Sequence, residues 1–236
     1  MRRYAHRPAG RQLPVAIPCP NALHVEIACG APNKREVKLT VERVVIVGAG
    51  IGGLATALGL RVSGFELSIV ERDPPRPAIE PEQAFERWAR EGVPHFRHAH
   101  ILLSRIQTTL RDHHPELLQQ LLAAGLYLST VEEVLPASQY QGLVPEAGDG
   151  DLLHLGGRRA TFEYVVRRYV ERLPNVRFIH DTRVVGIVAE QLGRALVLRG
   201  LELQQADDSR SQLLADVIVD ASGVRSKFPE GLAARG

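Results

Sequence analysis

Cysteine is scarce in this chain of 236 residues, because Cys19 and Cys29 are the only two. Both lie before residue 30, so a disulfide framework is excluded from the rest of the chain. That usage suits a reducing compartment, and we expect a cytoplasmic protein. No apolar run approaches the roughly 20 residues of a membrane-spanning helix, and we expect no membrane span.

Charge of one dominant sign is also missing. The chain has 29 Lys and Arg against 27 Asp and Glu, a net charge of +2. This balance gives no reason to expect nucleic acid as a partner. Two motifs are absent as well: the Gly-x-Ser-x-Gly turn of α/β-hydrolases and the Gly-Lys-Ser/Thr phosphate loop. The sequence therefore supports neither of those two classes.

The first forty residues differ from the rest in composition. They carry a net charge of +5, against −3 for the remainder, and show no sustained periodicity. They also contain five prolines: Pro8, Pro14, Pro18, Pro20 and Pro32. The segment has neither the apolar stretch of a secretory signal nor the serines of a transit peptide. We expect residues 1–40 to be a basic extension that is either disordered or not native coding sequence.

Residues 44–72, VVIVGAGIGGLATALGLRVSGFELSIVER, form the most informative segment. An apolar run enters a Gly-x-Gly-x-x-Gly turn, and a helical pattern and a second apolar run follow. This order is typical of a strand–turn–helix–strand unit that binds a dinucleotide, with the pyrophosphate at the helix N-terminus. Glu71 stands 23 residues after Gly48, close to the spacing of an acid that hydrogen-bonds a ribose hydroxyl.

The glycines of this turn have different predicted roles. Gly48 permits a tight turn, Gly50 lets the backbone approach a pyrophosphate, and Gly53 lets the helix pack closely on the sheet. Arg72, directly after Glu71, is a candidate adenosine contact, with a plain surface arginine as the alternative. The predicted cofactor-binding turn comprises Gly48, Ala49, Gly50, Ile51, Gly52 and Gly53.

The remaining pattern predicts further helices and strands around this unit. Helical spacing marks residues 54–62, 101–114, 115–124 and 161–172. Strands are expected at residues 67–70, 176–179 and 217–219, with an antiparallel pair at 182–189 and 195–203. Residues 73–100 and 129–157 read as largely irregular. We predict an α/β fold, a Rossmann-like FAD-binding domain with a parallel sheet plus helical and antiparallel insertions.

Four segments between residues 43 and 230 resemble FAD-dependent monooxygenases of the aromatic-hydroxylase type, and they follow one another in the order expected for that family. These monooxygenases are class A flavoproteins and are related to epoxidases and geranylgeranyl reductases. The four segments are GAGIGGLA with the later Glu71–Arg72, GVPHFRHAHILL at 92–103, RRATFEYVVRR at 158–168, and ADVIVDASG at 215–223. Phe96 departs from the family's glycine before Arg97.

The resemblance implies further cofactor contacts. Arg97 and His98 would line the flavin pocket, and Arg159 would open a helix beside the flavin. Val184 would offer backbone groups to the adenine edge. Asp220 and Gly223 would close around FAD, with an ordinary turn after a buried strand as the alternative.

The implied function is FAD-dependent oxidoreduction, namely monooxygenation of a small organic substrate with NAD(P)H and O₂, as in hydroxylases and epoxidases. Because the cofactor carries that chemistry, we expect no catalytic side chain. Three alternatives stay open: a flavin-dependent reductase of isoprenoid double bonds, a simple NAD-binding domain, and a catalytically inactive dinucleotide-binding remnant.

Members of this family continue into a further stretch that carries a Gly-Asp motif beside the ribityl chain. The Gly-Asp pairs here, at 148–149 and 150–151, lie upstream of DASG and read as a polar loop. We therefore expect residues 41–236 to be an FAD-binding domain truncated before its C-terminal half.

Three closely spaced histidines, His95, His98 and His100, suggest a metal site. However, zinc sites need three or four ligands, and no cysteine or carboxylate lies closer to these histidines than Glu91. We expect no metal.

Overall fold

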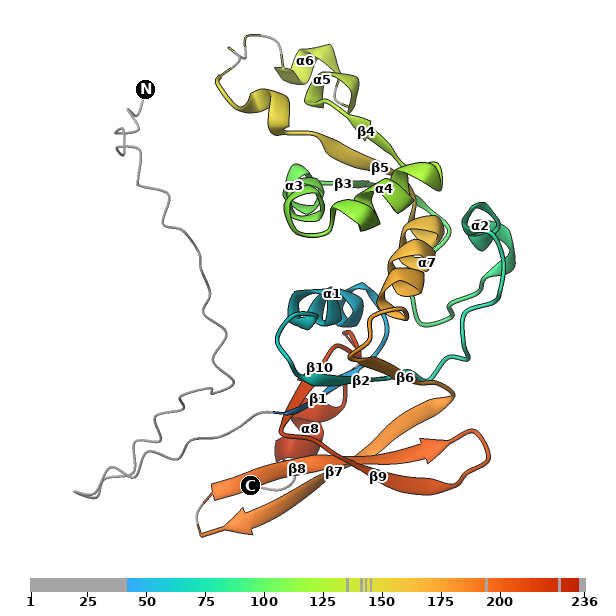
Figure 1. Cartoon of the computed structure of the whole chain (residues 1–236), viewed down its shortest axis with the longest axis vertical. Helices are drawn as coiled ribbons and strands as arrows, with labels where there is room; N and C mark the ends of the chain where they lie inside the picture. The colour runs from blue at the N-terminus through green and yellow to red at the C-terminus, as the bar shows by residue number, and fades with distance from the viewer. Residues whose placement is uncertain are drawn as a thin grey trace, which may run out of the picture. The chain divides into compact units, whose positions relative to one another are not determined.

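A computed structural model describes residues 42–134, 136–140, 142, 144, 146–193, 195–224 and 226–233. The prediction made for residues 1–40 lies outside this range. The centre of the described part is a four-stranded parallel sheet in the order β10-β1-β2-β6 (Figure 1). Its strands are β1 Arg43–Val47, β2 Glu66–Val70, β6 Val176–Ile179 and β10 Val217–Asp220.

The register of the parallel sheet brings three strand ends together. Val47 at the end of β1 pairs with Val70 of β2 on one side and with Asp220 of β10 on the other. Residues that follow parallel strands emerge at the same edge of a sheet. The glycine-rich turn, Glu71 and the DASG segment therefore share one edge.

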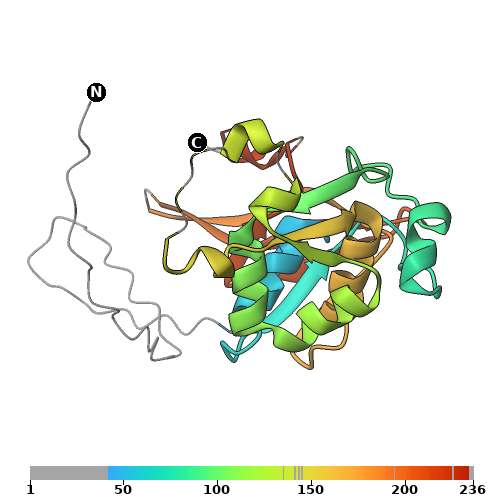
Figure 2. The ribbon, with the colours of Figure 1, turned by 90° about the horizontal axis from the view of Figure 1, so that it is seen from above.

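Helices cover one face of this sheet and build the largest core. They are α1 Ile51–Leu60, α3 Ser104–His113, α4 Pro115–Ala123 and α7 Arg159–Val170. Leu54 of α1, Leu121 of α4 and Val165 of α7 are fully buried in one cluster with Ile46 and Ile69 of the sheet. Figure 2, seen from above, shows the green helices beside β1 and α1, which are blue.

The opposite face packs against a three-stranded antiparallel sheet. Its strands are β7 Thr182–Leu192, β8 Ala195–Gln205 and β9 Arg210–Leu214, in the order β7-β8-β9. Leu201 and Leu203 of β8 join Val45 and Val47 of β1 in a second core cluster. The predicted antiparallel pair is confirmed, and β9 is an additional strand that the sequence patterns did not reveal.

A third sheet, β3-β5-β4, corrects two predictions. It consists of β3 Ala99–Leu102, β4 Tyr127–Ser129 and β5 His154–Arg158. The helix expected from residue 101 begins at Ser104, because residues 99–102 pair with β5. The region expected to be irregular contains β5, whose sequence HLGGR hides its alternation behind two glycines. The ring of Tyr127 fills the space over Gly156, where a Cβ would lie 2.5 Å from the ring carbon Cζ.

Shorter elements complete the described chain. They are η1 Pro81–Gln83, α2 Ala84–Arg87, α5 Val131–Val134, α6 Ala137–Tyr140, η2 Asp149–Asp151 and α8 Phe228–Ala233. The Gly-Asp pairs lie in and beside η2, which is exposed as a polar loop would be. Trp88, after α2, packs edge-on against Phe96 and Tyr164 in a third core cluster. The predicted α/β fold is confirmed. Within the described ranges, no helix is both long and apolar enough to cross a bilayer.

Candidate functional site

The glycine-rich turn lies directly against the segment that follows β10. Gly48 has a φ of +100°, and a Cβ there would lie 2.7 Å from the carbonyl oxygen of Ala221. A Cβ on Gly53 would overlap the carbonyl oxygen of Gly48. Gly48 and Gly53 are thus required by backbone conformation and close packing, as the motif predicts.

Gly50 and Gly52 have the opposite surroundings. No atom lies within 4 Å of a Cβ built on either residue. Gly50 is the N-cap of α1, so this open space lies beside the first backbone N–H groups of a helix. Helix N-termini of this kind favour anions because their N–H groups are unpaired and the helix dipole is positive there. The turn therefore offers space and donors for a diphosphate.

Glu71 follows β2 and is 96% buried, with a relative exposure of 4%. Its Oε2 accepts the backbone N–H of Ala49 at 2.9 Å, and its Oε1 accepts the N–H of Asp73 at 3.1 Å. These bonds hold the carboxylate beneath the glycine-rich turn, at the strand end where the ribose acceptor is predicted.

Arg90 is a residue of this site that the sequence patterns did not reveal. Its Nη2 donates to Oε2 of Glu71 at 2.9 Å, and its Nη1 donates to the carbonyl oxygen of Ala49 at 3.3 Å. Its Nε lies 2.8 Å from Oδ2 of Asp73. Arg90 is 7% exposed and lies in a segment without motif or periodicity, so no sequence signal marked it.

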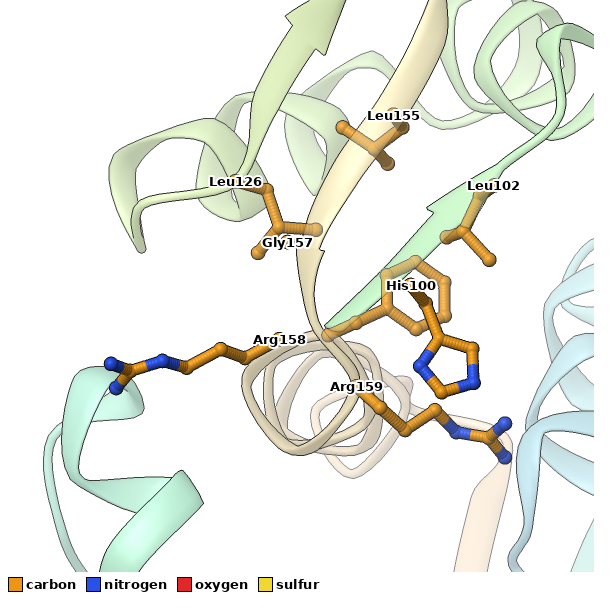
Figure 3. Close-up of a pocket in the computed structure, with 8 residues that line it drawn as sticks. His100, Leu102, Leu126, Leu155, Gly157, Arg158 and Arg159 are labelled. Atoms are coloured by element: carbon orange, nitrogen blue, oxygen red, sulfur yellow. The ribbon is translucent and has the colours of Figure 1, made fainter. Parts of the chain in front are cut away.

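The start of α7 lies beside a small pocket formed with β3 and β5 (Figure 3). Arg158 and Arg159 extend in opposite directions in this view: Arg159 passes beside His100, and Arg158 extends toward α2. The guanidinium of Arg158 lies over the ring of Phe85, 4.7 Å from its centroid. The remaining lining is mainly apolar: Leu102, Leu126, Leu155, Gly157 and Phe162. The predicted Arg159 therefore borders a pocket with a cationic rim.

A buried carboxylate connects Arg159 with Arg90. Glu163 of α7 has no exposed surface, and its two oxygens lie 3.2 Å from Nη1 of Arg90 and 3.5 Å from Nη2 of Arg159. Burial raises the pKa of Glu163, and the charges of Arg90, Arg159 and Arg167 oppose that rise without cancelling it. Through Glu163, the start of α7 is linked to the glycine-rich turn.

Asp220 stands at the end of β10, on the other side of β1 from Glu71. Its carboxylate accepts hydrogen bonds from the Ser222 N–H at 3.1 Å and from the hydroxyls of Ser222 and Ser226. Partial burial raises the pKa of Asp220, but these hydrogen bonds outweigh burial and the net pKa is lowered. Gly223 follows with a φ of +92°, which favours glycine. The DASG segment is thus a polar turn next to Gly48.

Three predicted contacts have partners away from the turn. Arg97 donates to the backbone carbonyls of Phe85 and Glu86 on α2. The Arg72 side chain is 55% exposed, and its Nε lies 3.5 Å from Oδ1 of Asp73. Val184 is half-buried in β7 and packs on the second core cluster.

The three closely spaced histidines do not assemble a metal site with acidic or sulfur ligands. The rings of His95 and His98 meet edge to face, 5.0 Å apart, and His100 Nδ1 lies 3.2 Å from the carbonyl oxygen of His98. Among the residues that the structure describes, no group of three or more His, Cys, Asp and Glu could hold a metal ion.

No protein-family model and no curated protein matches this sequence. Solved structures do match its fold. PqsL from Pseudomonas aeruginosa, a probable FAD-dependent monooxygenase, is 18% identical with a TM-score of 0.54, over 82% of this chain and 45% of PqsL. The p-nitrophenol 4-monooxygenase PnpA from Pseudomonas putida is 17% identical with a TM-score of 0.53, over 81% of this chain and 43% of PnpA.

THI4 from Thermovibrio ammonificans also matches, at 14% identity and a TM-score of 0.53, over 83% of this chain and 62% of THI4. This chain therefore spans about half the length of the structures that it matches. The likeness shows the fold: the described residues have the Rossmann-like α/β fold of the FAD-binding domain of such monooxygenases, as the motifs predicted.

Proposed function

We propose that this chain binds FAD and is the FAD-binding part of a monooxygenase. Such an enzyme uses NAD(P)H and O₂ to oxygenate a small organic substrate. The observation that carries the proposal is the glycine-rich turn. Gly48 and Gly53 allow the turn to pack closely against DASG and α1. Gly50 and Gly52 leave open space at the N-terminus of α1. That division is expected where a pyrophosphate approaches the backbone.

The residues around this space have complementary chemistry. The N-terminal amides of α1 would bind the pyrophosphate, and Glu71 would accept a ribose hydroxyl. Arg90, held at the turn by the carbonyl of Ala49, would place a positive charge near the phosphates. Asp220 and Gly223 stand at the point where the strand order reverses between β2 and β10, the usual place for a ligand in an open α/β sheet.

Arg159, His100 and the apolar pocket beside them would border the reacting end of the cofactor, with Arg97 and His98 in the adjoining segment. When bound, FAD supplies the redox chemistry, and the chain binds it, orients it and limits its contact with water. We name no side chain as acid, base or nucleophile. Arg72 and Val184 would contact the adenosine portion.

The first experiment measures whether FAD remains with the protein. The purified chain is mixed with FAD, passed through a gel-filtration column and examined by visible absorption. We expect flavin bands to co-elute with the protein. Gly50→Val should abolish co-elution because its side chain fills the open space, whereas Gly59→Val, at an exposed and equally open position on the same helix, should retain it.

A wild-type chain that releases all added FAD would refute the binding proposal. If FAD is retained, NADH and NADPH are each added and oxygen uptake is followed. Reduction of the bound flavin by neither nucleotide would refute the proposed electron donor while leaving FAD binding intact.

A further inference from the structure

The most unusual group outside the predicted contacts is the carboxylate of Glu163. It lies on α7 with no exposed surface, and neither oxygen has a partner in good hydrogen-bond geometry. A buried carboxylate costs free energy unless neighbouring charges and hydrogen bonds compensate it. An apolar residue at this position would fill the same core, so packing alone does not account for Glu163.

Its surroundings are those of a counter-ion shared by two arginines. Oε1 faces Arg90 at 3.2 Å and Oε2 faces Arg159 at 3.5 Å. Arg90 comes from the segment after α2, whereas Arg159 opens α7. One buried carboxylate thus connects the two arginines that border the glycine-rich turn and the pocket.

Arg90 is held from two sides. Glu71 contacts Nη2 at 2.9 Å, while Glu163 and the carbonyl oxygen of Ala49 both approach Nη1, at 3.2 Å and 3.3 Å. A ribose hydroxyl that bonds to Glu71 would compete with Nη2 for the same carboxylate. Glu163 does not face that competition, because it is fully buried.

We propose that Glu163 is a positioning residue for the dinucleotide site: it holds Arg90 and Arg159 in place when a bound nucleotide engages Glu71. This inference rests on the proposed FAD site. A pyrophosphate would then bind near two guanidiniums that are already oriented, which lowers the entropy lost on binding.

The same arrangement makes the attraction of Glu163 for Arg90 and Arg159 dependent on pH. The charged groups near Glu163 are Arg90 after α2, Glu71 and Asp73 after β2, and Arg159 and Arg167 on α7 itself. A protonated Glu163 attracts Arg90 and Arg159 less. Because burial raises the pKa of Glu163, this loss begins at a higher pH than for an exposed glutamate.

The test is FAD affinity measured by flavin fluorescence between pH 5.5 and pH 8.5. We expect Glu163→Gln to weaken binding about tenfold at pH 8, within the range of coupling between contacting charges. Its affinity should also change less with pH than that of the wild-type chain. The matched control is Glu171→Gln, directly after α7, since Glu171 pairs with Arg76 at 2.6 Å and with Arg167 at 3.5 Å but not with Arg90. This control should bind FAD within about twofold of wild type, because it leaves the contacts of Arg90 intact.

A double-mutant cycle with Arg90→Gln separates positioning from general damage to the fold. If Glu163 acts mainly through Arg90, the double variant should bind FAD nearly as well as Arg90→Gln alone. Additive losses both in this cycle and in the matching cycle with Arg159→Gln would overturn the inference, as would an unchanged affinity and pH profile in Glu163→Gln. If Glu163→Gln does not fold by circular dichroism, Glu163→Asp replaces it and should weaken binding while retaining the pH dependence. A wild-type chain that binds no FAD would refute the proposed function and this inference together.

Discussion

The parallel sheet and the β3-β5-β4 sheet differ in how their two faces are covered. Ile46 and Ile69 of the parallel sheet are fully buried, and core clusters lie on both of its faces. In the β3-β5-β4 sheet, Leu155 is fully buried, but Ile101 on the other face is 48% exposed. Strands covered on both faces form continuous apolar runs, whereas strands covered on one face alternate and are less conspicuous.

The difference extends to where charge is buried. At the end of the parallel sheet, Glu71 and Arg90 are each below 10% exposure, and Arg90 contacts the fully buried Glu163 of α7. Burying such charges costs free energy, so they stay buried only where several partners hold them. The parallel sheet, which is packed on both faces, therefore supports a charged site at its edge. The β3-β5-β4 sheet, which is covered on one face, contributes mainly apolar walls to the neighbouring pocket.

Among the substitutions that test this difference between the two sheets, glycine substitutions in the turn have the largest expected effect on stability. Gly53→Ala should lower the free energy of unfolding by about 3 kcal/mol, because its Cβ meets a backbone carbonyl that cannot move away easily. Gly50→Ala is the control, since its φ of −76° suits alanine and its Cβ meets no atom within 4 Å. Urea unfolding measures both. Equal stability of the two variants would contradict the close approach of α1 to the sheet.

Truncating a leucine in β5 tests whether the covered face of the β3-β5-β4 sheet contributes to the stability of the hydrophobic core. Leu155→Ala should cost about 2 kcal/mol, at the low end for a buried leucine, because a sheet with one open face can relax around the cavity. Ile101→Ala, which removes a comparable aliphatic side chain from the exposed face, should change the unfolding free energy by less than about 0.5 kcal/mol. Similar losses for both would mean that another surface covers this face in solution.

The smallest expected effect concerns His180, which follows β6. Burial lowers its pKa, and the neighbouring charge of Arg167 lowers it further. Because the folded-state pKa lies below the unfolded value near 6.5, His180 contributes stability above that pH and loses it as the pH falls through the folded-state pKa. The neutral ring accepts a hydrogen bond from Arg167, with Nη2 3.1 Å from Nδ1.

The measurement is the unfolding free energy at pH 8 and pH 5.5. His180→Gln should lose less stability over that interval than the wild-type chain. A loss as large as that of wild type would assign the acid sensitivity to other groups, such as the buried His114, whose pKa is also lowered mainly by burial.

Local patterns predicted the strand–turn–helix–strand unit well because each of its features is a local requirement. Gly48 needs a positive φ, Gly53 needs close helix packing, and the apolar runs of β1 and β2 need burial on both faces. The same reasoning failed for β5, where two glycines remove the side chains that carry a strand's alternation. It also read residues 101 and 102 as the start of a helix, although they pair with β5.

Sequence alone determined the class of fold, the position of the glycine-rich turn and the acid at the end of β2. Those features depend on spacing within about thirty residues, and local backbone geometry converts such spacing directly into structure. Only the tertiary structure decided that Glu163 contacts Arg90 as well as Arg159, because Arg90 comes from a segment that shares no pattern with α7. Their contacts depend on how α7 packs over the sheet, where burial makes each charge need the others.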